Sequence, residues 1–203
     1  MSREIVIASR NRGKIAEIRQ IFADMPFRMH TLLDFPDAPE IAETGATFAE
    51  NARLKAMGAA KFVKLWALAD DSGVEVDALG GGPGVRSARY SGDGADPEAN
   101  NRRLLRDLAA VADPGRSARY RAVMVLATPE GRIVAEAEGS CEGTIAREPR
   151  GTAGFGYDPL FVLPEFGQTM AELGLEIKNR ISHRAVALRR LRDRLAELGL
   201  SRD

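Results

Sequence analysis

The chain has 203 residues, of which 44% are hydrophobic and 29% charged, a balance typical of a soluble globular protein with a proper core. Its 29 basic residues equal its 29 acidic residues, so the formal net charge of zero argues against nonspecific nucleic-acid binding by a strongly basic surface. Any anion site must therefore be local. The single cysteine, Cys141, excludes an intrachain disulfide framework and is compatible with a reducing compartment.

The apolar run near the N-terminus, residues 5–8, is too short for the core of a signal peptide. Nowhere does the chain approach the roughly 20 apolar residues that a membrane-spanning helix needs. We therefore expect a cytoplasmic protein that binds neither a membrane nor nucleic acid.

The first half of the chain predicts strands that alternate with helices. Thr47 and Glu50 form a capping box, which marks the start of a helix. The glycine-dense run 79–84 lacks the strand-turn-helix context of a dinucleotide-binding fingerprint, so we reject a Rossmann fold. From hydrophobic periodicity, the expected elements are strand 4–8, helix 14–22, a helix from 47 to about 64, and strands 65–69 and 74–79.

The second half predicts a strand hairpin and a long C-terminal helix. Pro97 stands at the first turn of a helix that continues through Leu108, and Pro129-Glu130-Gly131 is a hairpin turn between strands 117–128 and 132–140. Strand 160–163 follows a second glycine cluster. Thr169 and Glu172 match a second capping box, and Ser182 caps the last helix, whose apolar stripe is Leu188, Leu191, Leu195 and Leu198. Without a repeat or linker, we expect one domain of two lobes over residues 1–203.

Two adjacent carboxylates, Asp70 and Asp71, follow a short apolar strand and precede Ser72-Gly73. Successive strand residues point to opposite faces, so one carboxylate is expected to hold structure while the other meets solvent or a metal. Carboxylates with substrate phosphates are the ligands that magnesium prefers. The alternative is an Asx turn that ends the strand.

A phosphate site is predicted where the first strand meets the first helix. The junction contains Ser9, Arg10, Asn11, Arg12, Gly13 and Lys14. It places a hydroxyl, an amide, a lysine and free backbone N–H groups at a helix N-terminus, where the helix dipole favours anions. It is not a Walker loop, and a capped helix start with solvated basic residues is the alternative.

Two further features predict ligand contacts. Lys178, His183 and Arg184 surround the start of the last helix, where positive side chains conflict with the helix dipole unless an anion or a carbonyl-rich ligand binds. Ordinary surface residues are the alternative. Phe155 lies between two glycines and could stack on a flat ring, or it could anchor the loop in the core.

A series of short blocks matches one known family, in order, from Ile5 through Leu195. The blocks are Ser9 to Lys14, Glu43-Thr44-Gly45, Thr47-Phe48, Glu50-Asn51-Ala52, Ala69-Asp70-Asp71-Ser72-Gly73, Leu79-Gly80-Gly81 with Pro83-Gly84, Ser87-Ala88-Arg89-Tyr90-Ser91-Gly92, Gly154-Phe155-Gly156-Tyr157-Asp158-Pro159 and Ser182-His183-Arg184. On these blocks the chain resembles the inosine triphosphate pyrophosphatases, which act on non-standard purine nucleotides, and especially their bacterial branch. Ser9-Arg10 departs from the Thr-Gly or Ser-Asn of many relatives.

The resemblance implies an α/β fold of elongated, two-lobed form, with a long mixed β-sheet, flanking helices and an active-site cleft between the lobes. It also implies hydrolysis of ITP, dITP and XTP to the monophosphate and pyrophosphate, which removes deaminated purines from the nucleotide pool. Magnesium dependence and a homodimer are implied as well.

The resemblance also implies roles for individual residues. Glu43 and Asp71 would hold magnesium, and Asp71 would be the general base. Ser9 to Lys14 and Ser72 would bind phosphate. Phe155 would stack on the purine, and the remaining pocket residues would be Gly156, Tyr157, Asp158, Lys178, His183 and Arg184.

Two other classes of protein are alternatives. A nucleotide-binding module without turnover would need neither Glu43 nor Asp71 as metal ligands. A Maf-type pyrophosphatase acting on modified nucleotides is not expected to carry the Phe155-Gly156-Tyr157-Asp158 or Ser182-His183-Arg184 blocks.

Overall fold

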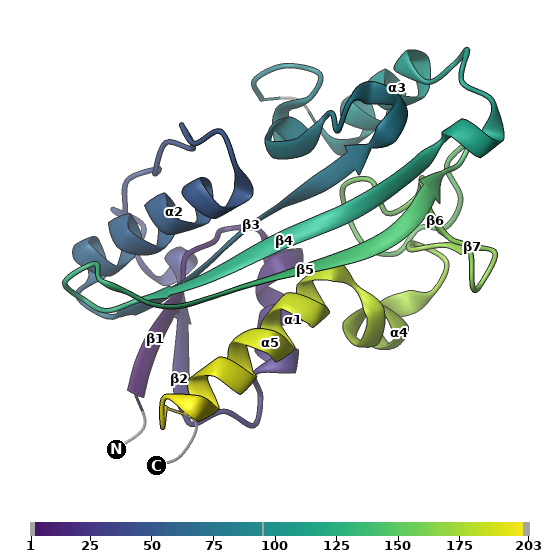
Figure 1. The fold of residues 1–203 in the computed structure, drawn as a ribbon. Coiled ribbons are helices and arrows are strands. Elements are labelled where there is room, and N and C mark those ends of the chain that lie inside the picture. Colours follow the sequence, from purple (N-terminus) through teal and green to yellow (C-terminus); the bar gives the residue numbers. More distant parts are fainter. Residues whose placement is uncertain (1–2, 95, 201–203) are drawn as a thin grey trace. The chain divides into compact units, whose positions relative to one another are not determined.

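The structure, a computed structural model, describes residues 3–94 and 96–200. Within these residues the strands form a mixed sheet in the order β2-β1-β3-β4-β5-β6-β7 (Figure 1). The strands are β1 (Arg3–Ile7), β2 (Phe27–Thr31), β3 (Trp66–Val76), β4 (Ser117–Ala127), β5 (Ile133–Ile145), β6 (Phe161–Leu163) and β7 (Gln168–Thr169). The helices are α1 (Arg12–Ile21), α2 (Phe48–Val63), α3 (Pro97–Asp107), α4 (Gly174–Ile181) and α5 (His183–Glu197).

Parallel and antiparallel pairs both occur, as predicted for a mixed sheet. β1 pairs in parallel with β2 and β3, with Ile5 opposite Met29 on one side and Trp66 on the other. β6 is antiparallel to β5 and β7. The α/β class with flanking helices is therefore confirmed.

Two compact units make up the chain. The first contains the described residues up to Asp71, together with Ala122–Gly139 and those from Arg184 onward. The second contains Ser72–Arg121 and Ser140–His183, with residue 95 outside the described part. Each unit is considered by itself below.

The first unit buries both faces of its strands. Ile5 and Ile7 belong to a core with α1 and α5, whereas Val6 between them is fully buried from the opposite side. Figure 1 shows α2 on the other side of these strands from α1 and α5. The leucine stripe of α5 belongs to this core through Leu188, Leu191 and Leu195, each stabilising the unit by about 1.5–3 kcal/mol. Leu198, the predicted fourth member, is 55% exposed and lies beyond the helix.

The second unit has its own core, in which α3 and the 160–173 segment pack on strands. Leu104 and Leu108 are fully buried beside Val74 and Phe161. The predicted N-terminal proline of α3 is confirmed at Pro97, preceded by Asp96, whose side chain accepts a hydrogen bond from the backbone N–H of Ala99.

Three expected elements differ from the structure. Strands 65–69 and 74–79 are one continuous strand, β3, so the expected turn at Ser72-Gly73 is wrong. Gly73 permits this course, because a Cβ there would lie 2.3 Å from the Ser87 hydroxyl and 2.5 Å from the Gly84 carbonyl. The strand thus continues past a close neighbour that only glycine tolerates.

The second predicted capping box does not begin a helix. Thr169 ends β7, and Glu172 accepts its backbone N–H at 2.7 Å within a turn, while α4 starts only at Gly174. The hydrogen bond of a helix cap is present, but residues 168–169 pair with β6 and therefore belong to the sheet. β2 was not predicted, because its Phe-Arg-Met-His-Thr sequence forms a half-buried edge strand without a clear apolar run.

Among residues 3–94 and 96–200, no helix combines the length and apolar character needed to cross a bilayer.

Candidate active site

Seven ionisable side chains of the first unit meet in a network that we call the charge cluster. They come from α1, the loop before α2, α2 itself, β3 and the start of α5. The members are Lys14, Glu17, Glu43, Lys55, Asp70, Asp71 and Arg184.

Strand alternation divides the cluster at its two aspartates. Asp70 shares the parity of Leu68, which faces α1 and α5, and its carboxylate meets Lys14 and Arg184. Asp71 has the opposite parity and meets residues of α2. The adjacent carboxylates therefore have different partners.

Asp70 is the better-paired aspartate. Its Oδ1 lies 2.8 Å from Lys14 Nζ and its Oδ2 lies 3.2 Å from Arg184 Nε, with only 1% of the carboxylate side chain exposed. Burial by itself would raise the pKa of Asp70, but the nearby cations, Lys14 foremost, outweigh it and hold the pKa far below its usual range. Asp70 therefore remains an anion that orients cations.

Asp71 is paired with residues of α2. Its Oδ1 accepts from Lys55 Nζ at 2.8 Å, and the same nitrogen lies 2.8 Å from Glu43 Oε1. Asn51 donates to Asp71 Oδ2 at 3.3 Å. Burial raises the pKa of Asp71 despite the nearby lysine, which moves this carboxyl toward the range of an effective general base.

The predicted phosphate loop is a capped helix start. Ser9 Oγ accepts the N–H of Asn11 at 3.1 Å, and Asn11 Oδ1 accepts the N–H of Lys14 at 3.1 Å as the N-cap of α1. Arg10 donates to the carbonyl of Ala38 at 2.6 Å, so this unusual residue binds the 35–40 loop. Arg12 and Gly13 form the first turn of α1. Local hydrogen bonds thus position the helix N-terminus with Lys14 directed at Asp70.

A second group of side chains lies in the second unit, and we call it the aromatic site. Its members are Tyr120, Phe155, Asp158, Lys178 and His183. Asp158 is its centre, since Oδ1 accepts from the Tyr120 hydroxyl at 3.1 Å and Oδ2 accepts from Lys178 at 2.6 Å and from the N–H of Phe155 at 2.9 Å. Asp158 is only 2% exposed, and its hydrogen bonds fix the loop that carries Phe155.

The two cationic or basic members of the aromatic site contact aromatic rings. Lys178 Nζ lies 4.3 Å from the centroid of Phe155, and the ring of His183 stacks on Tyr120 at 4.6 Å with an interplanar angle of 12°. Lys178 and His183 are each 3% exposed. The site therefore offers a ring and buried nitrogen donors held in fixed orientations.

Backbone geometry explains the glycines around Phe155. Gly154 has φ +80°, and a Cβ there would lie 2.1 Å from Asp158 Oδ2, so no side chain fits at this position. Asn101 on α3 donates to the carbonyl of Gly156 at 3.1 Å, and the hydroxyl of Tyr157 donates to the carbonyl of Ser87 at 2.8 Å. These two hydrogen bonds hold the loop at Gly156 and Tyr157.

The structure places the predicted site residues in both units. Ser9 to Lys14, Glu43, Asp71 and Arg184 belong to the first unit; Ser72, Phe155 to Asp158, Lys178 and His183 belong to the second. The charge conflict inferred at the start of the last helix is relieved within the protein, because Arg184 pairs with Glu17 and Asp70, and Lys178 pairs with Asp158. Arg184 is 1% exposed, so its guanidinium acts in the charge cluster here.

Sequence reasoning missed three members of these networks. No role was predicted for Lys55 or for Glu17, which lies in a helix predicted from its apolar residues. Asn51 was named only as part of a block that matches the family. Asn51 and Lys55 are four residues apart on α2, a spacing that puts them on one helix face beside small alanines. That polar pair on an otherwise apolar face was the available signal.

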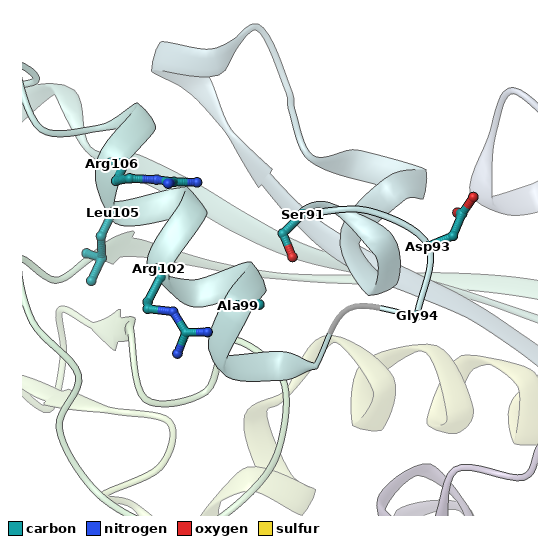
Figure 2. Close-up of a pocket in the computed structure, with 7 residues that line it drawn as sticks. All are labelled: Ser91, Asp93, Gly94, Ala99, Arg102, Leu105 and Arg106. Atoms are coloured by element: carbon teal, nitrogen blue, oxygen red, sulfur yellow. The ribbon is translucent and has the colours of Figure 1, made fainter.

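A separate hollow lies beside α3. Figure 2 shows its lining from α3 and the loop before it, and its volume is about 670 Å³. The lining residues are Ser91, Asp93, Gly94, Ala99, Arg102, Leu105 and Arg106, none of which belongs to the charge cluster or the aromatic site.

Comparisons with known proteins give one consistent result. Residues 5–194 match the model of the Ham1 family. The chain is 53% identical to the dITP/XTP pyrophosphatase of Geobacillus kaustophilus over 97% of this chain and 96% of that protein. It is 52% identical to the dITP/XTP pyrophosphatase of Geobacter sulfurreducens, over 97% and 98% respectively.

Solved structures agree. A HAM1 protein from Coxiella burnetii superposes with a TM-score of 0.86 at 44% identity, covering 96% of this chain and 99% of that one. A nucleoside-triphosphatase, also titled dITP/XTP pyrophosphatase, from Mycobacterium abscessus superposes with a TM-score of 0.74 at 44% identity, over 93% and 98%.

Proposed function

Because this chain belongs to the Ham1 family, we propose that it hydrolyses the non-standard purine nucleotides ITP, dITP and XTP to the monophosphate and pyrophosphate. The observation that carries this proposal is the charge cluster, in which Lys14, in the first turn of α1, and Lys55, in the middle of α2, each lie beside carboxylates. Such a set can exchange internal ion pairs for phosphate contacts. The reaction would remove deaminated purines before they enter DNA or RNA.

In this proposal the cluster binds the triphosphate by exchanging charges. Lys14 and the N–H groups at the start of α1 would meet phosphate oxygens, where the helix dipole also favours anions. Lys55 is held by two carboxylates. Burial would lower the pKa of Lys55, but the nearby carboxylates outweigh burial and raise the pKa. It would remain an ammonium and could turn from Asp71 to a phosphate oxygen.

The donor set fits a magnesium ion bound together with substrate. Glu43 Oε1 and Asp71 Oδ1 converge on one cationic nitrogen, each at 2.8 Å, so both can face a single cation. No group of three or more His, Cys, Asp and Glu side chains among residues 3–94 and 96–200 is arranged to hold a metal alone. This agrees with magnesium, which takes one or two carboxylates and completes its shell with phosphates and water. When bound, the ion would neutralise phosphate charge.

Asp71 would be the general base. A water would attack the α-phosphorus, its proton would pass to the carboxylate of Asp71, the anhydride bond between the α- and β-phosphates would break, and pyrophosphate would leave with the bonding electron pair. Asn51 orients this carboxylate through Oδ2, and Asp70 holds Lys14 in an ion pair that opposes the burial by which the pKa of Lys14 is lowered. The residues act by positioning and electrostatics rather than by a covalent intermediate.

The aromatic site would bind the base. Phe155 offers its ring for stacking, and Lys178 and His183 provide nitrogen donors for the six-position oxygen of hypoxanthine or xanthine. Adenine carries an amino group at that position and would leave buried donors unpaired, at about 1–3 kcal/mol each. Gly156, Tyr157, Asp158 and Ser72 would line or support the nucleotide. Arg184, which pairs with Glu17 and Asp70, would act on the phosphate side.

A product assay tests this function. ITP, dITP, XTP, GTP, ATP and a modified pyrimidine triphosphate are supplied with magnesium or with EDTA, and pyrophosphate and orthophosphate are measured separately. We expect pyrophosphate from ITP, dITP and XTP, loss of activity in EDTA, and rejection of ATP. Orthophosphate as the first product, or equal cleavage of ATP and ITP, contradicts the proposal.

The same panel separates the alternatives. Preferred cleavage of the modified pyrimidine nucleotide would favour a Maf-type enzyme, and tight ITP binding without any product would favour a noncatalytic module. Lys178→Met and His183→Ala sharpen the result, because both should reduce the ratio of ITP to ATP cleavage. An unchanged ratio in both variants removes the base-reading role from these residues.

We also propose that residues 1–203 form one cooperative domain, that the protein is a cytoplasmic homodimer, and that its partner is a nucleoside triphosphate rather than nucleic acid or a membrane. The family resemblance and the zero net charge support these statements. Sedimentation at several concentrations tests the dimer, and calorimetric unfolding as a single transition tests the domain.

A further inference from the structure

We propose that Glu17 is a positioning residue of the active site, which fixes the ammonium of Lys14 through Arg184 and Asp70. The inference rests on the proposed phosphate-binding role of Lys14 and adds a residue to which no role has been given. Four side chains form the chain of contacts: Glu17 to Arg184, Arg184 to Asp70, and Asp70 to Lys14.

The first link joins two helices. Glu17 lies on α1, one turn after Lys14, and is 2% exposed. Its carboxylate accepts a hydrogen bond from the guanidinium of Arg184, which is itself 1% exposed at the start of α5. A carboxylate buried to this extent is stabilised only by such a partner. The pair therefore sets where Arg184 lies relative to α1.

The second link transmits that position to β3. The guanidinium is a rigid planar fork, so holding Nη1 on Glu17 limits the directions in which Nε can donate. Nε meets Asp70 Oδ2 at 3.2 Å. Glu17 thus restrains the carboxylate of Asp70 without touching it.

The third link reaches the phosphate-binding group. With Oδ2 of Asp70 committed to Arg184, Oδ1 faces Lys14 Nζ at 2.8 Å. Lys14 is the most exposed of the four, with 17% of its side chain accessible, so it is the member that can meet a ligand. The other three residues form a buried support behind it.

Charge balance gives the reason for a carboxylate at this position. Two anions, Glu17 and Asp70, alternate with two cations, Arg184 and Lys14, so the set is neutral. If residue 17 were neutral, Asp70 would be the only carboxylate of this set left to balance both cations. Arg184 would then compete with Lys14 for Asp70, and the ammonium of Lys14 would lose its fixed place.

The test is a double-mutant cycle on ITP hydrolysis with Glu17→Gln, Lys14→Met and the combined variant, measured below the unfolding temperature of each. We expect Glu17→Gln to raise KM for ITP about tenfold, a typical size for a contact-network effect, with a smaller change in kcat. In the Lys14→Met background the same change should leave KM unaltered. A residue that only stabilises the fold would show no such dependence on Lys14.

A matched control comes from the same pair of helices. Asp24 follows α1 and binds Arg192 of α5 at 2.7 Å on the surface, so Asp24→Asn removes an α1–α5 ion pair outside the cluster. It should leave KM unchanged. Glu17→Asp keeps the negative charge but shortens the side chain by one methylene. Its KM should lie between those of the unmodified protein and Glu17→Gln. This variant serves as the test if Glu17→Gln does not fold.

Three results overturn the inference. If KM is unchanged in both Glu17 variants but raised in Lys14→Met, Glu17 has no positioning role and Lys14 keeps its phosphate-binding role. Additive effects of Glu17→Gln and Lys14→Met show that Glu17 does not act through Lys14. Unchanged KM in Lys14→Met removes the inference together with the phosphate-binding role on which it rests.

Discussion

The charge cluster and the aromatic site both contain buried carboxylate–lysine pairs, but the two sites arrange them differently. In the charge cluster, carboxylates and cations are present in similar numbers, and Lys55 is shared between two carboxylates. In the aromatic site, one carboxylate, Asp158, holds three donors. The first arrangement can exchange partners with an incoming ligand, whereas the second is fixed by its own hydrogen bonds.

This difference assigns separate tasks to the two regions. A cluster that exchanges ion pairs suits phosphates, which vary little among nucleotides. A fixed ring with buried donors suits a base, since an unmatched base leaves polar groups unpaired. Substitutions in the charge cluster should therefore alter turnover and stability for every substrate, and those in the aromatic site should alter affinity and selectivity.

The largest expected effect is the loss of stability in Asp70→Asn. This change leaves Lys14 and Arg184 without their shared anion, and breaking a buried pair on one side typically costs about 3–5 kcal/mol. Chemical denaturation measures the free energy of unfolding. Glu136→Gln, which removes the partly exposed partner of Arg53, is the control and should cost no more than about 1 kcal/mol. Equal losses of unfolding free energy in the two variants would show that the buried network stabilises the fold no more than the Arg53–Glu136 pair does.

Next in size is the loss of turnover in Asp71→Asn. Removing the proposed base should lower kcat at least about a hundredfold while nucleotide binding remains measurable. Asp70→Asn should reduce kcat less, because Asp70 orients Lys14 and does not take the proton. Side-by-side steady-state kinetics with ITP decide between them, and the reverse order would exchange their roles.

A smaller effect is expected in the aromatic site from Phe155→Ala. Loss of base stacking is worth roughly 1–3 kcal/mol, so KM for ITP should rise about tenfold or more with kcat little changed. Phe155→Tyr keeps the ring and should retain most of the affinity. A large fall in kcat with unchanged KM would contradict the separation of tasks between the two regions.

The smallest effect is a pH dependence that differs in sign between the two aspartates. The pKa of Asp70 is lowered, so its contribution to stability is complete above the unfolded-state pKa, about 4, and is lost as the pH falls. The stability gap between the unmodified protein and Asp70→Asn should therefore narrow from pH 6 to pH 3.

The pKa of Asp71 is raised, so its ionised form is disfavoured in the folded state at neutral pH. The stability of Asp71→Asn relative to the unmodified protein should therefore be greater at pH 7 than in acid, where the penalty for ionising Asp71 vanishes. Denaturation curves at several pH values check both signs, and parallel pH profiles of the two variants would refute the assignment.

Local sequence signals determined much of the fold. The Thr47 capping box predicts α2, and both of its hydrogen bonds are present. Pro97 marks the start of α3, and the turn at 129–131 joins β4 to β5. These signals are short-range, because each depends on residues within a few positions of one another. Strand alternation likewise implied that Asp70 and Asp71 serve different partners, which the structure confirms.

What only the tertiary structure decided is where distant groups meet. Arg184 and Asp70 are 114 positions apart, and Arg184 and Glu17 are 167 apart, so no local pattern indicates these contacts. The same holds for β3, which continues past the close approach of Ser87 because residue 73 is a glycine. Residues 168–169 joined a strand rather than a helix because β6 pairs with them. The sequence by itself determined the local elements and the family motifs, whereas long-range packing decided which ionic side chains satisfy one another, since a buried charge takes the partner that the fold brings within reach.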